Sequence, residues 1–197
     1  MGKKIILSLV SICFATILFA QQSLLNTYNK DREKISKNGI KVLGVYSIAN
    51  IIYGSIAASQ ATGSNKYFHK MNAIWNGITL GITGIGFLIA KKEAELTNSA
   101  SLKKQGNIEK LFLFNTGLDV AYVVGGAYLK ERSKNTNKNS EKLKGYGESI
   151  MLQGSVLLLF DGIMYALHNK HGKLLNKTED NVKIGSTGNG IGLVVKL

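Results

Sequence analysis

Four long apolar segments dominate the chain, and each is close to the ~20 residues with which a helix crosses a bilayer. They cover Ile40–Ala61, Met71–Ala90, Leu111–Leu129 and Ile150–Leu167, and connectors rich in Lys, Asn and Ser separate them. The chain has no proline, which suits unbroken helices. The pattern predicts an all-α fold, a four-helix transmembrane bundle made of two helical hairpins.

Weaker patterns flank these segments. Leu24, Tyr28, Arg32 and Ile35 recur at helical spacing, which predicts a short amphipathic N-terminal helix that lies on the membrane surface and ends at Lys37–Gly39.

The C-terminal end alternates between apolar and other residues from Ile191 to Leu197. A two-residue period predicts a short extended segment or strand. The expected domains are therefore a signal peptide (1–20), an amphipathic segment (21–38), a four-helix membrane domain (39–168) and a polar tail (169–197).

Each apolar segment also carries polar residues on one helix face. Asn115, Asp119 and Tyr122 are spaced i, i+4 and i+7 in the third segment, and the other segments show similar stripes. We expect these stripes to face one another as an intramembrane polar seam, while Leu, Ile, Val and Phe face lipid. The seam comprises Asn50, Tyr53, His69, Asn72, Asn76, Asn115, Asp119, Tyr122, Gln153 and Asp161.

Asp119 is the costliest member of this seam. The third segment has nine Leu, Phe or Val residues, each favouring insertion by roughly 0.3–0.6 kcal/mol, and a central Asp opposes insertion by about 2.5–3.5 kcal/mol. Asp119 therefore needs a partner or a proton. The candidate partners are Lys70, His69, Asn50, Tyr53 and a water molecule.

Two interpretations of the acidic residues stay open. Asp119 and Asp161 form a proton or cation site with Tyr122 as a donor, because ionisable groups inside a membrane are often functional. Alternatively, they hold the helices together through hydrogen bonds.

The two halves of the chain resemble each other weakly. "ANIIYG" aligns with "LDVAYV", which matches Asn50 with Asp119, and "WNGITL" aligns with "LQGSVL", which matches Gly77 with Gly154. Tandem duplication of a hairpin would give parallel repeats. Gly77 and Gly81 also form a small-residue face of the kind that lets helices approach closely in lipid.

Composition limits the chemistry. The formal charge is +13, mostly from Lys, which favours anionic lipid head groups over nucleic acid as a partner. Cys13 is the single cysteine and lies in the signal, so no disulfide is expected. His168 and His171 could share a metal ion, but no further ligand is placed beside them, so we expect no metal site and no cofactor. We find no catalytic constellation and expect a protein that is not an enzyme.

The first residues read as a targeting segment. Lys3 and Lys4 precede an apolar run that ends at Ala20, which is typical of a Sec signal peptide cleaved after that residue. An uncleaved anchor helix is the alternative. The bacterial inner membrane is then the expected location. The alternative of a soluble periplasmic bundle is disfavoured because the first two segments lack a charged face.

Several stretches together resemble a known family: "NGIKVLGVYSIANIIYG", "KYFHKMNAIWNGI", "FNTGLDVAYVVGGAYL" and "GYGESIMLQGSVLLLFDGIMY". The chain resembles an uncharacterised family of exported, four-helix membrane proteins of Bacteroidota over Ile40 to Tyr165. The resemblance implies that the seam residues belong to the family pattern, and it implies no activity. We therefore expect a structural or interaction protein of the cell envelope, with a small transporter or channel-like protein as the alternative. Membrane lipids are the expected partners, together with a second copy of the chain or another membrane protein.

Overall fold

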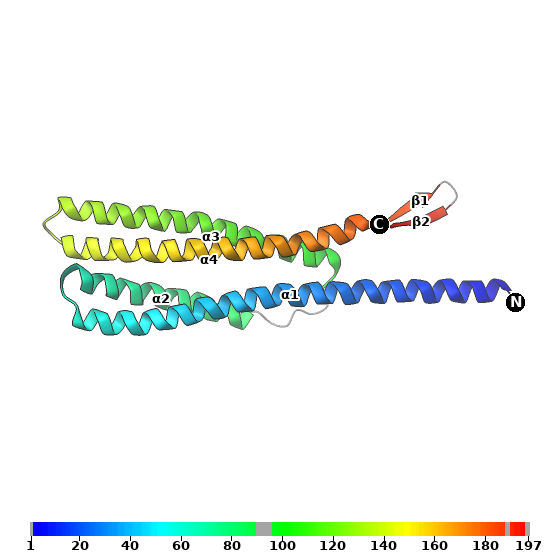
Figure 1. The fold of residues 1–197 in the computed structure, drawn as a ribbon, viewed down its shortest axis with the longest axis horizontal. Coiled ribbons are helices and arrows are strands. Elements are labelled where there is room, and N and C mark those ends of the chain that lie inside the picture. Colours follow the sequence, from blue (N-terminus) through cyan, green and yellow to red (C-terminus); the bar gives the residue numbers. More distant parts are fainter. Residues whose placement is uncertain (1, 90–95, 188–189, 196–197) are drawn as a thin grey trace.

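The computed structural model describes the backbone of residues 2–89, 96–187 and 190–195, and side chains for residues 22–88 and 96–174. Figure 1 shows long helices laid side by side, with both termini at one end. The elements are α1 (Gly2–Gln60), α2 (Gly63–Ile89), α3 (Asn98–Arg132), a 3-10 turn η1 (Ser133–Asn135), α4 (Ser140–Asn181), β1 (Val182–Thr187) and β2 (Gly190–Val195).

The α4 helix organises the packing. It lies along α3 for most of its length, contacts α2 on another side and touches α1 more briefly, while α1 and α2 lie against each other. The turns after α1 and after α3 lie together at the end opposite the termini (Figure 1). Gly63 opens α2 with φ +59°, a left-handed conformation that glycine adopts without steric cost.

The predicted end of a separate N-terminal helix at Lys37–Gly39 is wrong, because α1 continues through these residues to Gln60. Gly39 is buried, and a β-carbon there would lie 2.5 Å from Met164 Cε. The glycine therefore serves the close approach of α1 to α4 and does not end a helix. Likewise, α4 continues beyond residue 168 to Asn181, so neither expected edge of the 39–168 domain coincides with the end of an element.

Glycines lie at the closest contacts between helices, but they are not the glycines that the sequence pattern indicated. A β-carbon on Gly126 would lie 2.6 Å from Gly147 O, and the reverse is also true, so the α3 and α4 backbones almost touch there. Gly54 lies against the α2 backbone in a similar way. A β-carbon added to Gly77 or Gly81 would have no neighbour within 4 Å, so their face is not used for packing within the chain.

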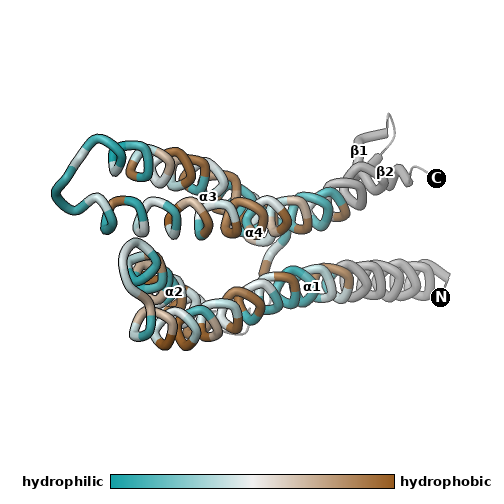
Figure 2. The backbone as a smooth tube through the Cα atoms, turned by 60° about the vertical axis from the view of Figure 1, so that its left-hand side comes forward, coloured by the Kyte–Doolittle hydropathy of each residue, from teal (hydrophilic) through white to brown (hydrophobic). Residues whose placement is uncertain are grey.

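Burial is inverted relative to a water-soluble protein. Among the described residues, sixteen buried side chains are polar or charged and three are hydrophobic: Leu25, Tyr28 and Met164. Many Ile, Leu, Val and Phe side chains instead point outward, for example Val45, Ile82 and Leu159, each 66–68% exposed. Figure 2 shows hydrophobic residues along all four helices and hydrophilic ones in the turn between α3 and α4.

Helix length and hydropathy identify three stretches as able to cross a membrane: Gln22–Gln60, Asn98–Asn135 and Ser140–Leu174. The α2 helix is outside this set although it has no charged residue from Met71 to Ile89. It carries Asn72 and Asn76, and both are buried. The helices are also longer than a bilayer needs: the 35 residues of α3 span about 52 Å, against a hydrocarbon core of about 30 Å.

An antiparallel pair of strands follows α4. Val182 pairs with Val195 and Thr187 with Gly190. The extended segment expected near the C-terminus corresponds to β2, and β1 is the partner strand that the sequence pattern did not indicate. Leu197 lies outside the described residues, and the side chains of 1–21 do as well, so the signal peptide and its cleavage site stay predictions.

Candidate functional site

Five side chains of the predicted seam region form a connected amide cluster, which we define as Tyr46, Asn50, Asn72, Asn76 and Gln153. Asn72 Nδ2 donates to Asn50 Oδ1 (3.1 Å), and Asn76 Nδ2 donates to Asn72 Oδ1 (3.2 Å) and to Gln153 Oε1 (3.2 Å). Gln153 Nε2 donates to Asn72 Oδ1, and the Tyr46 hydroxyl donates to Gln153 Oε1 at 3.0 Å. The cluster thus joins α1, α2 and α4.

Helical spacing accounts for the amide cluster. Asn72 and Asn76 are one turn apart on α2, as are Tyr46 and Asn50 on α1, so each pair lies on one face. Asn72, Asn76 and Gln153 are at most 2% exposed, and their amides bond to one another, as buried polar groups require. Asn76 Oδ1 is the exception, since it is buried without a hydrogen-bond partner. Asn76 and Gln153, which correspond in the weak internal repeat, meet directly across the α2–α4 contact.

Asp119 and Asp161 form a second contact, the carboxyl pair, between α3 and α4. They are 3% and 6% exposed, and the two side chains lie within hydrogen-bonding contact of each other. Two carboxyl groups can share a hydrogen bond when one of them carries a proton. None of the four residues expected as partners of Asp119 is the one observed, because the second carboxyl takes that place.

The other four seam residues lie nearer the surface of the bundle. Tyr53 is 62% exposed and meets the half-buried His69 ring edge-on at 5.4 Å. Tyr122 is 36% exposed and lies edge-on to Trp75 at 4.8 Å. Asn115 is half-buried, one turn before Asp119. Tyr122 therefore contacts α2 through its ring, and no hydrogen bond from it to the carboxyl pair is observed.

Sequence reasoning missed a second polar centre at the end of the bundle where the termini lie. We call it the terminal cluster and define it as Asn29, Arg32, Ser101, Gln105, His168 and His171. Arg32 is fully buried and donates to Ser101 O (2.9 Å) and Ser101 Oγ (3.1 Å), while Ser101 donates to Asn29 Oδ1. These contacts join α1 to the first turns of α3.

Histidines complete the terminal cluster on α4. His171 stacks on the Tyr28 ring at 4.1 Å and its Nε2 donates to Tyr28 O at 3.0 Å. His168 is fully buried, stacks on Phe112 and is hydrogen-bonded to the Ser36 hydroxyl at 3.3 Å. The two rings therefore contact different partners, and among the described residues no group of three His, Cys, Asp or Glu side chains could hold a metal ion.

The sequence pattern indicated only one side of the terminal cluster. Tyr28 and Arg32 do share the face predicted for the N-terminal segment. Their partner Ser101 lies in the stretch "KKEAELTNSASLKKQGNIEK", which reads as a connector because of its Lys and Asn content. In the structure α3 begins there at Asn98, with the Thr97 side chain capping it by accepting from Ala100 N at 3.4 Å.

Comparison with known proteins places the chain in one family. A family of unknown function, DUF6992, matches residues 42–162, a range that contains the amide cluster and the carboxyl pair and lies within the stretch that carried the family resemblance. No curated protein and no solved structure matches the chain. Since the match covers more than half of the sequence, the chain belongs to the DUF6992 family of unknown function.

Proposed function

We propose that this protein is an integral membrane protein of the bacterial cell envelope that acts as a non-enzymatic structural or interaction protein. One observation carries the proposal: among the described residues most buried side chains are polar, and many large apolar side chains face outward. A water-soluble protein would show the reverse. In hydrocarbon the arrangement is favourable, because polar groups can find partners only in one another.

The same observation supports a structural use of the seam. The amides of Asn72, Asn76 and Gln153 are engaged with each other, and Asp161 is engaged with Asp119. Groups bonded in this way stabilise contacts between helices. We therefore assign the seam the role of holding four membrane-spanning helices together, with two pairs of adjacent helices joined across the α2–α4 contact.

Fractionation tests the membrane assignment. Full-length protein expressed in a Gram-negative host should stay in the pellet after extraction of the membranes with alkaline carbonate. N-terminal sequencing of the same material should begin at Gln21 if the signal is cleaved after Ala20. Release into the carbonate supernatant would refute the proposed function, whereas an intact N-terminus would change only the export route to an uncleaved anchor.

The burial of two carboxyl groups in contact with each other favours a second candidate, a small transporter or channel-like protein in which Asp119 and Asp161 bind a proton or cation. Purified protein in liposomes should then dissipate an imposed proton or sodium gradient, followed with an entrapped fluorescent indicator. Asp161→Asn should abolish that flux. Gradient decay no faster than in empty liposomes would remove this candidate.

A further inference from the structure

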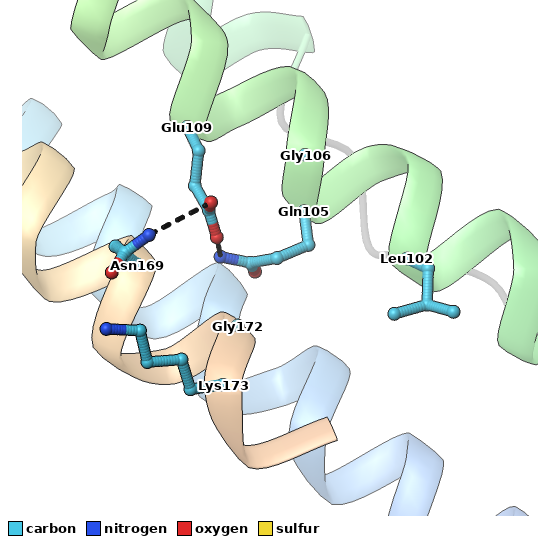
Figure 3. A pocket seen from close by; sticks show the side chains of 7 residues that line it. All are labelled: Leu102, Gln105, Gly106, Glu109, Asn169, Gly172 and Lys173. Carbon is cyan, nitrogen blue, oxygen red and sulfur yellow. Dashed lines mark hydrogen bonds between the residues drawn. The ribbon is translucent and has the colours of Figure 1, made fainter. Parts of the chain in front are cut away.

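A cavity of about 360 Å³ opens beside the terminal cluster, between the start of α3 and the end of α4. Leu102, Gln105, Gly106 and Glu109 line it from α3, and Asn169, Gly172 and Lys173 line it from α4. Figure 3 shows the polar ends of Gln105 and Glu109 directed toward α4, with Asn169 and Lys173 on the opposite wall. Its size is that of a site for a small molecule.

Gln105 contributes a buried acceptor without a donor. Its Nε2 donates to Glu109 Oε1 (2.8 Å) and to His168 O (2.6 Å), and these two acceptors fix the orientation of the amide. The nitrogen and oxygen of this amide are therefore not interchanged. The oxygen, Oε1, is buried without a hydrogen-bond partner in a side chain only 3% exposed. Such an atom costs free energy unless a donor reaches it.

Glu109 adds a negative charge to the same wall. Its two oxygens accept from Gln105 and, at 3.5 Å, from Asn169 Nδ2. A carboxylate offers about four acceptor positions, so two are left for a ligand. A primary ammonium group, with three N–H donors and one positive charge, matches the combination of Glu109 and the Gln105 oxygen.

The opposite wall is suited to an anion. Lys173 supplies an ammonium group to this wall (Figure 3). Gly172 packs directly against Gln105 and Glu109, because a β-carbon there would clash with Glu109 Oε1. Lysine is a common phosphate ligand in proteins. The cavity lining has no aromatic residue, and quaternary ammonium groups are recognised by aromatic cages, so the site is unsuited to choline.

The location of the cavity also restricts the ligand. Glu109 lies two residues before the apolar segment Leu111–Leu129, and Asn169 lies two residues after Ile150–Leu167. On the proposed membrane placement, this is the depth of the lipid head groups. We propose that the cavity binds a phosphoethanolamine zwitterion, with its ammonium on Glu109 and Gln105 and its phosphate on Lys173. The lipid source of this group rests on the proposed function, whereas its chemical class rests on the cavity alone.

Lipid retention by the full-length protein in detergent tests the proposal. Native mass spectrometry would compare short-chain phosphatidylethanolamine, phosphatidylcholine and phosphatidylglycerol at equal concentrations. We expect phosphatidylethanolamine to bind about tenfold more tightly than the other two, because only it places N–H donors on a charged acceptor. Equal retention of the ethanolamine and choline lipids would overturn the proposal.

Two variants connect the preference with the cavity. Glu109→Gln should abolish it, while Glu148→Gln should not, because Glu148 pairs with Lys130 far along the bundle. Gly106→Leu should fill the cavity without changing charge, since nothing lies within 4 Å of its β-carbon, and Gly117→Leu on the same helix is the matched control. Retention of the preference in both Glu109→Gln and Gly106→Leu would contradict the assignment.

Free O-phosphoethanolamine separates the two sources of the group. If it displaces the lipid, the head group alone is recognised. If it binds while the lipid does not, the ligand is the soluble compound and the chemical class stands. If neither binds, the proposal fails even when carbonate extraction places the protein in the membrane, so this failure is distinct from failure of the proposed function.

Discussion

The amide cluster and the terminal cluster are both polar cores, but their outer surfaces differ. Around the amide cluster, the outward residues are apolar, such as Val45, Ile52 and Ile78. Around the terminal cluster, the outward residues include Lys30, Lys34, Lys103 and Lys170. The interior chemistry follows this difference: the first region uses neutral amides, whereas the second buries the guanidinium of Arg32.

The contrast shows what the surroundings of a helix demand from its interior. On the proposed membrane placement, hydrocarbon surrounds the amide cluster and the carboxyl pair, and it cannot solvate a permanent charge, so neutral amides and paired carboxyl groups are the favoured polar groups there. Water would surround the terminal cluster, where burying a charge costs less free energy and Arg32 can hold α1 to α3.

The largest effect is expected at Arg32. Arg32→Met keeps most of the aliphatic stem but removes both hydrogen bonds to Ser101 and leaves Asn29 and Ser101 without their charged neighbour. We expect a loss of about 3 kcal/mol in the free energy of unfolding, measured by thermal or SDS-induced unfolding in detergent. Lys34→Met, on the exposed face of the same helix, should change stability by less than about 0.5 kcal/mol. Similar values for the two variants would contradict a structural role for the terminal cluster.

A smaller effect is expected in the amide cluster. Gln153→Leu removes bonds to Tyr46, Asn72 and Asn76. Hydrogen bonds between helices in lipid contribute less than those in water-facing cores, so we expect a loss of about 1–2 kcal/mol by the same unfolding assay. Ser155→Leu lies on an exposed position of the same helix and serves as the control. A gain in stability from Gln153→Leu would show that the amides are kept for a purpose other than helix packing.

The smallest effect is expected at the carboxyl pair. Asp161→Asn supplies an amide N–H that can donate to Asp119, so the two side chains can stay hydrogen-bonded. If the pair holds helices together, stability should change by less than about 1 kcal/mol and the protein should accumulate normally. A normal level of folded protein combined with loss of ion flux in liposomes would instead favour the proton or cation site.

The sequence indicated the fold of the region around the amide cluster well because its signal is strong there. A run of uncharged residues with one Asn per turn, as at Asn72 and Asn76, has few interpretations other than a helix with one polar face. The same reasoning placed Asn50 and Gln153 in the interior. It named other residues than Asp161 as the partner of Asp119, because the register between α3 and α4 depends on glycine contacts such as Gly126 with Gly147. Pattern analysis of single helices does not contain this register.

The terminal region was harder to predict for a different reason. Ser101 and Gln105 lie in a stretch whose Lys and Asn content is typical of a connector, and only three-dimensional packing against Arg32 and His168 shows that one face is buried. Gly39 was likewise interpreted as a helix stop, because a glycine that permits close packing and one that ends a helix look the same in sequence. A buried polar residue is thus hard to recognise in the sequence of a helix whose outer face is charged, and easy to recognise where the outer face is apolar.

Accessibility of single cysteines tests most directly whether hydrocarbon surrounds these helices. In a Cys13→Ser background, Ile78→Cys and Ile163→Cys would each be treated in intact membranes with a membrane-impermeant maleimide, with Lys103→Cys as the water-facing reference. Ile78 and Ile163 are both 60% exposed in the fold, so labelling depends on what covers them. The account predicts that neither reacts until SDS is added, while Lys103→Cys reacts once both membrane faces are accessible. Labelling of Ile78→Cys and Ile163→Cys as fast as Lys103→Cys would contradict it.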